Sequence, residues 1–216
     1  MKVALIGASG FVGKAILQEL LQRGHEVTAI ARNAANIPTQ PNVNIVAADV
    51  FNEAELSRAL TGNDVVISAY NAGWTNPNLH DDYLAGAKSI QEATKKAGVQ
   101  RLIVIGGAGS LFIAEGKQLV DSAEFPKDWK PGALAAREYL DIIKQEDTLD
   151  WTFFSPAIEM HPGTSGTRKG SYRTSLDTPV FDENGKSILS VEDVAVAITD
   201  ELEKPRYIRK RFTAAY

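Results

Sequence analysis

The sequence contains no cysteine among its 216 residues, which excludes disulfide bonds and metal sites built from thiolates. Histidine is also scarce, with three in the chain. One cluster, His80-Asp81-Asp82, has metal-ligand side-chain types, but adjacent residues on a helix point apart. We therefore expect no bound metal. A chain without cysteine also fits a reducing compartment, so we expect a cytoplasmic protein.

Long hydrophobic runs are missing too. No apolar stretch approaches the ~20 residues that a membrane-spanning helix requires. Residues Met1-Lys2-Val3 lead into a predicted strand without the charged segment, apolar core and cleavage site of a secretory leader. The net charge of −4 does not favour a broad nucleic-acid-binding surface. We expect neither a membrane nor a nucleic-acid partner, but a small molecule bound by a monomer or homodimer.

Glycine, in contrast, is placed at regular intervals near the N-terminus, at Gly7, Gly10 and Gly13. The apolar run Val3–Ile6 predicts a buried parallel strand, and the amphipathic run Phe11–Arg23 predicts a helix. The N-terminus of a helix has unpaired N–H groups and a partial positive charge, so it accepts a phosphate. The first glycine permits the tight turn, the second lets a pyrophosphate approach, and the third lets helix and strand pack closely. The predicted dinucleotide-binding residues of this turn are Gly7, Ala8, Ser9, Gly10, Phe11, Val12 and Gly13.

Strand and helix patterns alternate along the rest of the chain. The predicted strands are Val3–Ile6, Val27–Ala31, Val43–Ala47, Val65–Ser68, Leu102–Ile105, Trp151–Phe154 and Phe212–Ala215. The predicted helices are Phe11–Arg23, Glu53–Leu60, Asn78–Ala97, Gly132–Gln145 and Val191–Glu203. This alternation predicts an α/β protein with a doubly wound parallel sheet, an NAD(P)-binding Rossmann fold. We expect one domain over residues 1–216, in which the polar residues 155–190 form a small substrate-facing cap.

The glycine spacing, with two residues between successive glycines, resembles the extended and atypical short-chain dehydrogenase/reductase superfamily. In dinucleotide-binding folds an acidic residue at the end of the second strand binds the ribose 2′-OH of NAD. Here that place is taken by Arg32, whose guanidinium can pair with a 2′-phosphate. This favours NADPH, while the alternative, a solvated arginine, leaves NADH possible.

Further cofactor contacts are predicted where the other strands end, because ligands bind at that edge of such sheets. They are Asp49 and Val50, then Ser68, Ala69 and Tyr70, then Gly106 and Gly107, and finally Pro156 and Ala157. The resemblance implies that Asp49 contacts the adenine amine and that residues 155–157 contact the nicotinamide through the backbone. The alternatives are that Asp49 or Asn52 caps the next helix, and that the glycines form a tight turn with positive φ.

A motif that most members of the superfamily carry is absent. They have Tyr-x-x-x-Lys on the helix before the sixth strand, with the tyrosine as general acid. Here Tyr139 and Lys144 are five residues apart, a spacing that does not share a helix face. This absence argues against epimerase or dehydratase chemistry on nucleotide sugars.

The absence is shared by a narrower group that the chain resembles over essentially its whole length: NADH-flavin reductases, biliverdin reductase B-like flavin reductases and NmrA-like proteins. The motifs behind this resemblance lie at residues 7–13, 104–110, 155–157, 182–187, 190–195 and 210–213. It implies an NAD(P)H-dependent reductase of a flavin, FMN or riboflavin, or of a similar conjugated acceptor. Hydride passes directly between the two ring systems, so no side-chain acid is required.

Several residues remain as candidates for the acceptor side. Ser110 is the first candidate for a polar contact and Tyr139 the second, although Ser110 could equally cap a turn. Trp74 could form a wall of the ring site, and the basic loop Gly166–Arg173 could bind an anion or be solvated. Two other functions stay open: a non-catalytic NmrA-like sensor of NAD(P), and an NAD-dependent epimerase or dehydratase with relocated catalytic groups.

Overall fold

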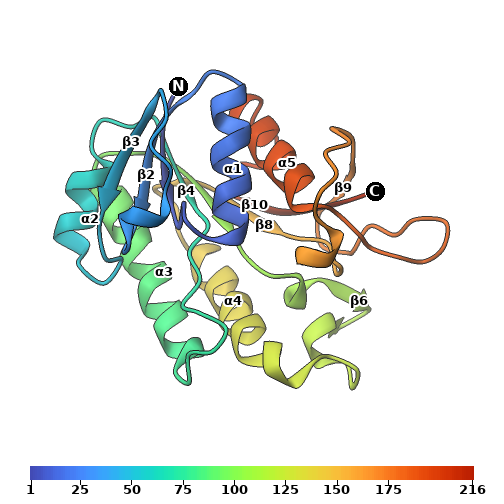
Figure 1. Ribbon diagram of the computed structural model, residues 1–216. Coiled ribbons are helices and arrows are strands. Elements are labelled where there is room, and N and C mark those ends of the chain that lie inside the picture. The colour runs from blue at the N-terminus through green and yellow to red at the C-terminus, as the bar shows by residue number, and fades with distance from the viewer.

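The computed structural model describes residues 1–216 and contains one sheet of eight strands (Figure 1). In spatial order the strands are β3 (Val43–Ala47), β2 (Glu26–Ala31), β1 (Lys2–Ile6), β4 (Val65–Ser68), β5 (Arg101–Ile105), β8 (Asp150–Ser155), β10 (Lys210–Ala215) and β9 (Arg173–Ser175). Every neighbouring pair is parallel except β10 and β9, which are antiparallel. The order reverses between β1 and β4, which is the place where doubly wound sheets bind ligands.

Helices cover both faces of the sheet. They are α1 (Phe11–Gln22), α2 (Glu53–Leu60), α3 (Leu79–Lys96), α4 (Lys130–Ile143) and α5 (Val191–Glu203). Figure 1 shows α1 and α5 side by side on one face, with α2, α3 and α4 on the other. No helix combines the length and the apolar character needed to cross a membrane.

The strands are apolar on both sides because each side has its own core. In β1, Val3 and Leu5 pack under α1, whereas Ala4 and Ile6 pack towards α2 and α3. A strand buried on both faces shows a continuous apolar run, which is the pattern that predicted a parallel sheet. The predicted α/β Rossmann fold is confirmed, and the ends of the predicted elements are correct to within two residues.

Short elements that the sequence pattern did not indicate occupy the long connection between β5 and α4. They are the 3₁₀ turns η2 (Ala108–Ser110), η3 (Leu119–Asp121) and η4 (Lys127–Trp129), and the antiparallel pair β6 (Phe112–Ala114) and β7 (Lys117–Gln118). The region predicted as a cap contains the turn η5 (Pro162–Thr164) and strand β9. Because β9 pairs with β10, this region extends the main sheet as well as bordering its carboxyl edge.

Candidate dinucleotide and acceptor site

The turn after β1 can be built only with glycine at two positions. Gly7 has φ of +79°, and a Cβ atom there would lie 2.5 Å from the Ala69 carbonyl oxygen. A Cβ on Gly13 would lie 2.1 Å from the Gly7 carbonyl oxygen. These close approaches pack the start of α1 against the ends of β1 and β4, as the spacing of the glycines predicted.

The N-terminus of α1 is left open for an anion. Gly10 is the N-cap and offers no side-chain cap, and the first turn contains no acidic residue. The backbone N–H groups of Phe11, Val12 and Gly13 form no hydrogen bond, while Gly10 and Phe11 are exposed. Ala8 is buried and Ser9 half-buried. Unpaired donors and the positive end of the helix dipole are what a pyrophosphate requires, so the turn fits a dinucleotide.

Arg32 lies one residue beyond β2 and is exposed, with no ion pair to any carboxylate. Its charge nevertheless reaches the site, because it acts to lower the pKa of Tyr70. Asp49, beyond β3, acts in the opposite direction on the same hydroxyl. Arg32, Asp49 and Tyr70 thus follow three parallel strands, β2, β3 and β4, whose carboxyl ends lie at the same edge of the sheet.

The segment after β3 separates the two roles considered for Asp49. Asn52 caps α2, because its side chain accepts a hydrogen bond from the Glu55 N–H at 3.2 Å. Asp49 is exposed and accepts the Phe51 N–H at 3.1 Å with one carboxylate oxygen. Its other oxygen is free for a ligand, while Val50 is buried beneath.

Tyr70 is fixed against α3. Its hydroxyl donates to the Asp82 carbonyl oxygen at 2.9 Å, and its ring occupies the space over Gly86, where a Cβ would lie 2.5 Å away. Burial, reinforced by the charge of Asp82, raises the pKa of Tyr70 to about 12. Tyr70 therefore borders the site as a neutral ring. Ser68 is buried, and Ala69 forms the contact with Gly7 described above.

The glycines after β5 do not have the expected positive φ, so that alternative is wrong. Gly106 is required for packing, since a Cβ there would lie 2.0 Å from the Phe153 ring. Gly107 has an extended backbone, and a Cβ there would lie 3.5 Å from the Ala136 Cβ, an ordinary van der Waals contact. The N–H groups of Gly107 and Ala157, which follow the neighbouring strands β5 and β8, form no hydrogen bond within the chain. Beside them Pro156 is buried.

The two side chains predicted to contact an acceptor are both buried. Ser110 is 1% exposed, and its hydroxyl accepts a hydrogen bond from Arg211 at 3.1 Å. Tyr139 is also 1% exposed and donates to Gln91 at 3.2 Å, and burial raises its pKa well above the ordinary value. Neither hydroxyl is presented at the carboxyl edge, which corrects the prediction: Tyr139 belongs to the core and Ser110 anchors its own loop.

The basic loop Gly166–Arg173 does not offer free cations either. Arg168 binds both carboxylate oxygens of Glu19 at 2.8 Å. The Lys169 ammonium lies 3.6 Å from the centre of the Tyr216 ring. Arg173 donates to the Phe181 carbonyl oxygen at 2.7 Å. These contacts hold the loop against α1 and the C-terminal strand, so an anion would have to compete with them.

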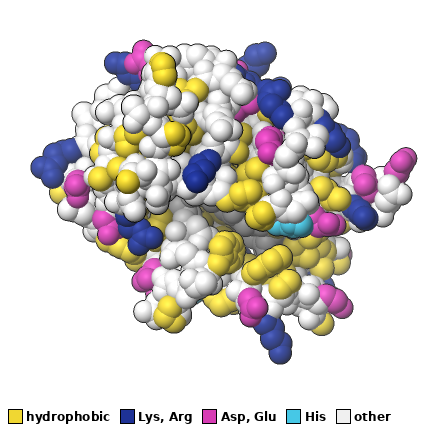
Figure 2. Space-filling model, in the orientation of Figure 1, with side chains coloured by type: hydrophobic (Ala, Val, Ile, Leu, Met, Phe, Trp, Pro, Cys, Tyr) yellow, Lys and Arg dark blue, Asp and Glu magenta, His cyan; other side chains and the backbone are white.

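Exposed hydrophobic side chains gather at the carboxyl edge. Of eight large exposed hydrophobic residues, five lie between the end of a parallel strand and the next helix: Phe11, Phe51, Trp74, Ile113 and Trp129. Leu176 and Phe181 follow β9, which runs antiparallel to its neighbour. Figure 2 shows such side chains along both sides of a hollow between α1 above and α3 and α4 below. Trp74 is 60% exposed, and its ring lies 3.1 Å from the place of a Cβ on Gly132. Exposed apolar surface of this kind marks a ligand site.

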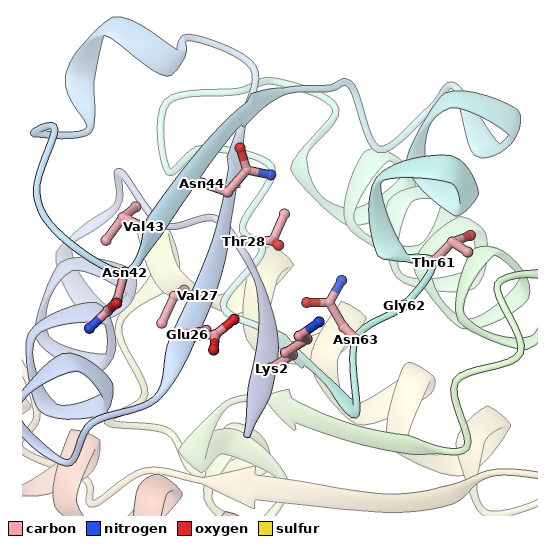
Figure 3. Close-up of a pocket in the computed structure, with 10 residues that line it drawn as sticks. All are labelled: Lys2, Glu26, Val27, Thr28, Asn42, Val43, Asn44, Thr61, Gly62 and Asn63. Atoms are coloured by element: carbon pink, nitrogen blue, oxygen red, sulfur yellow. The ribbon is translucent and has the colours of Figure 1, made fainter.

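A separate pocket lies at the opposite edge of the sheet, where β1, β2 and β3 begin. Its volume is about 560 Å³, and it is open and mostly polar. Figure 3 shows Lys2, Glu26, Thr28 and Asn63 gathered between these strands and the turn after α2. The free N–H groups and the glycine turn are all at the other edge, so this pocket is not the dinucleotide site.

Together, the fold and the free N-terminus of α1 define a protein that binds a nicotinamide dinucleotide. The chain belongs to the NAD(P)H-binding family, whose sequence profile matches residues 7–205.

Relatives of similar length carry several names. The uncharacterized protein YwnB of Bacillus subtilis (strain 168) is 41% identical, covering 99% of this chain and 97% of its own length. A proposed epimerase from Bacteroides thetaiotaomicron is 44% identical, with a TM-score of 0.91 over 100% of this chain and 96% of that structure. A proposed NADH-flavin reductase from Streptococcus pneumoniae TIGR4 is 36% identical, with a TM-score of 0.87 over 100% and 99%. One of these structures is named as an epimerase and the other as a flavin reductase, so the names differ on the reaction.

Proposed function

We propose that this protein is an NADPH-dependent reductase of a flat, conjugated acceptor such as FMN or riboflavin. The observation that carries the proposal is the composition of the carboxyl edge. It offers free backbone donors and exposed rings, while Tyr70 and Tyr139 direct their hydroxyls into the protein. A flavin accepts hydride on its own ring system and needs no side-chain acid.

Different residues bind different parts of the dinucleotide and the acceptor. The free N–H groups at the start of α1 hold the pyrophosphate, and Arg32 pairs with the 2′-phosphate. Asp49 accepts from the adenine amine. The N–H groups of Gly107 and Ala157 orient the nicotinamide amide, and Trp74 stacks on the acceptor and excludes water.

When bound, NADPH supplies a hydride, which is one proton with two electrons. The second hydrogen is a proton from solvent, so an oxidised flavin becomes a reduced flavin and the dinucleotide is released oxidised. The protein holds the nicotinamide ring and the flavin ring face to face in an apolar site that excludes water.

The test is the NADPH oxidation rate, followed by absorbance, with and without FMN or riboflavin. Binding of NADPH is measured separately through tryptophan fluorescence. The proposal expects flavin-dependent oxidation that saturates with flavin concentration. Tight binding of NADPH without turnover on any flavin or quinone would overturn it.

A second function is favoured by one observation, the burial of both predicted catalytic hydroxyls. A non-catalytic sensor of NADPH needs the dinucleotide turn and no proton donor. Such a sensor would bind NADPH and NADP⁺ with different affinities and would leave both unchanged, which the same pair of measurements detects.

A further inference from the structure

An apolar groove lies beside the predicted acceptor loop, between the β6–β7 pair and residues 178–181. Its volume is about 520 Å³, and its lining residues are Phe112, Ile113, Ala114, Glu115, Gly116, Thr178, Pro179 and Phe181. We propose that this groove is the outer part of the acceptor site and binds the apolar chain of an uncharged conjugated acceptor, with a prenylated quinone as the class of substrate. This inference rests on the proposed reductase function and narrows its substrate.

The groove is anchored to the loop that follows β5. Arg211 donates to the Ser110 carbonyl oxygen at 2.8 Å and to the Asp177 carboxylate at 3.0 Å. Phe112 donates its backbone N–H to the Asp177 carbonyl oxygen at 2.8 Å. Arg211 therefore joins Ser110, in the loop after β5, to Asp177, which precedes the wall of the groove at residues 178–181. Phe112, in the opposite wall, is joined to the same aspartate, so the groove adjoins the loop that begins at Gly106 and Gly107.

The charges around the groove disfavour a phosphorylated acceptor. Glu115 is the one charged lining residue, and its carboxylate repels an anion. The Arg211 side chain is 3% exposed and is paired with Asp177. Arg173 donates to the carbonyl oxygens of Phe181 and Tyr216. The lining residues of the groove include no cation, whereas recognition of the phosphate of FMN requires an unpaired Arg or Lys.

The apolar lining favours a hydrocarbon chain. Ile113 is 39% exposed and Phe181 is 44% exposed, so both have surface that a ligand would cover. Burying such surface stabilises a complex in proportion to the apolar area removed from water. The volume lies in the range of small-molecule sites, which is roughly 300 to 1,000 Å³. A short prenyl chain is apolar and small enough for a groove of this lining and volume.

The test compares one quinone head group without a chain and with two prenyl units, in the wild type and in Phe181→Ser and Ile113→Ser. We expect each substitution to raise the KM of the prenylated quinone by roughly 5- to 20-fold. The KM values of NADPH and of the bare head group should not change. Leu176→Ser is the matched control, because Leu176 is 45% exposed in the same segment but does not line the groove.

A binding measurement separates this inference from the reductase proposal. Binding of the prenylated quinone is followed without turnover, by tryptophan fluorescence, in the presence of NADP⁺. Binding that Phe181→Ser weakens supports the groove even if no NADPH is oxidised, in which case only the reductase proposal fails. Equal affinity of the wild type for the prenylated and bare quinones would overturn the inference, as would equal effects of Phe181→Ser and Leu176→Ser. Either result would leave the groove as a contact surface for a protein partner.

Discussion

Gly7 and Gly13 carry the dinucleotide turn at the scale of single residues. Each has a backbone oxygen within 2.5 Å of the place where a Cβ would stand. Gly10 differs, since a Cβ there would lie 3.3 Å from its nearest neighbour, the Gly7 carbonyl oxygen. The same motif therefore contains glycines needed for folding and a glycine needed mainly for the ligand.

Substitution of Gly13 and of Gly10 distinguishes the requirement for folding from the requirement for ligand binding. Gly13→Ala should lower the free energy of unfolding by roughly 1–3 kcal/mol, because the backbone must shift to admit the methyl group. Gly10→Ala should unfold at nearly the wild-type urea concentration but bind NADPH at least tenfold more weakly. Urea unfolding and fluorescence titration measure the two effects. Equal loss of stability in both variants would contradict this division.

Arg32 is the residue that we propose selects NADPH over NADH. Arg32→Ala should weaken NADPH binding by roughly 10- to 100-fold, since a hydrogen bond to a charged group contributes about 1.5–3 kcal/mol. Binding of NADH should stay as it is. Arg206→Ala, which removes another exposed arginine after α5, is the control. An unchanged NADPH-to-NADH affinity ratio in Arg32→Ala would show that Arg32 does not contact the 2′-phosphate.

Tyr139 was predicted to contact the acceptor, but its hydroxyl is buried in the core. Tyr139→Phe removes one buried hydrogen bond to Gln91, so it should cost about 1 kcal/mol of stability. Turnover should stay within a factor of two or three of the wild type. A loss of a hundredfold or more in kcat would instead mean that the hydroxyl takes part in the reaction.

At the scale of elements, the helices and central strands could be predicted because their apolar periodicity is local. Helix α2 and strands β3 and β4 match the predicted bounds in full. Strands β6, β7 and β9 are two or three residues long and largely exposed, so they carry no such pattern. The burial of Ser110 depends on Arg211, 101 residues further along, and that of Glu19 on Arg168, 149 residues further along. Contacts between residues so far apart in the sequence produce no local pattern from which they could be predicted.

The contact between helix α1 and the loop after η5 should make stability depend on pH. The hydrogen bond from Arg168 to the buried Glu19 carboxylate holds the pKa of Glu19 below its ordinary value, although burial opposes this effect. A carboxyl with a lowered pKa stabilises the fold above its unfolded-state pKa of about 4.3, and this contribution is lost as pH falls through the folded-state pKa.

Glu19→Gln should therefore be less stable than the wild type by a margin that shrinks with acidification. Urea unfolding at neutral pH and at successively lower pH values measures this margin. A margin that stays constant across the acid range would mean that the ionised carboxylate contributes nothing beyond its packing.

At the scale of the whole molecule, the two edges of the sheet have different characters. The amino edge has a polar pocket lined by Lys2, Glu26 and Asn63, among others. The carboxyl edge has the free amides of α1 and most of the exposed hydrophobic side chains. The topology places the carboxyl ends of the parallel strands at one edge, so residues from the six connections that follow β1, β2, β3, β4, β5 and β8 meet there. A dinucleotide and an apolar ring system are the ligands that suit this combination.

The most direct test of this account is the anaerobic stoichiometry of the reaction, with NADPH and a flavin or quinone present in equal amounts. Absorbance follows the oxidation of NADPH and the reduction of the acceptor in the same sample. The account predicts that the protein accelerates both, with one acceptor reduced for each NADPH oxidised. Both ligands binding while their absorbance changes no faster than in protein-free buffer would contradict it.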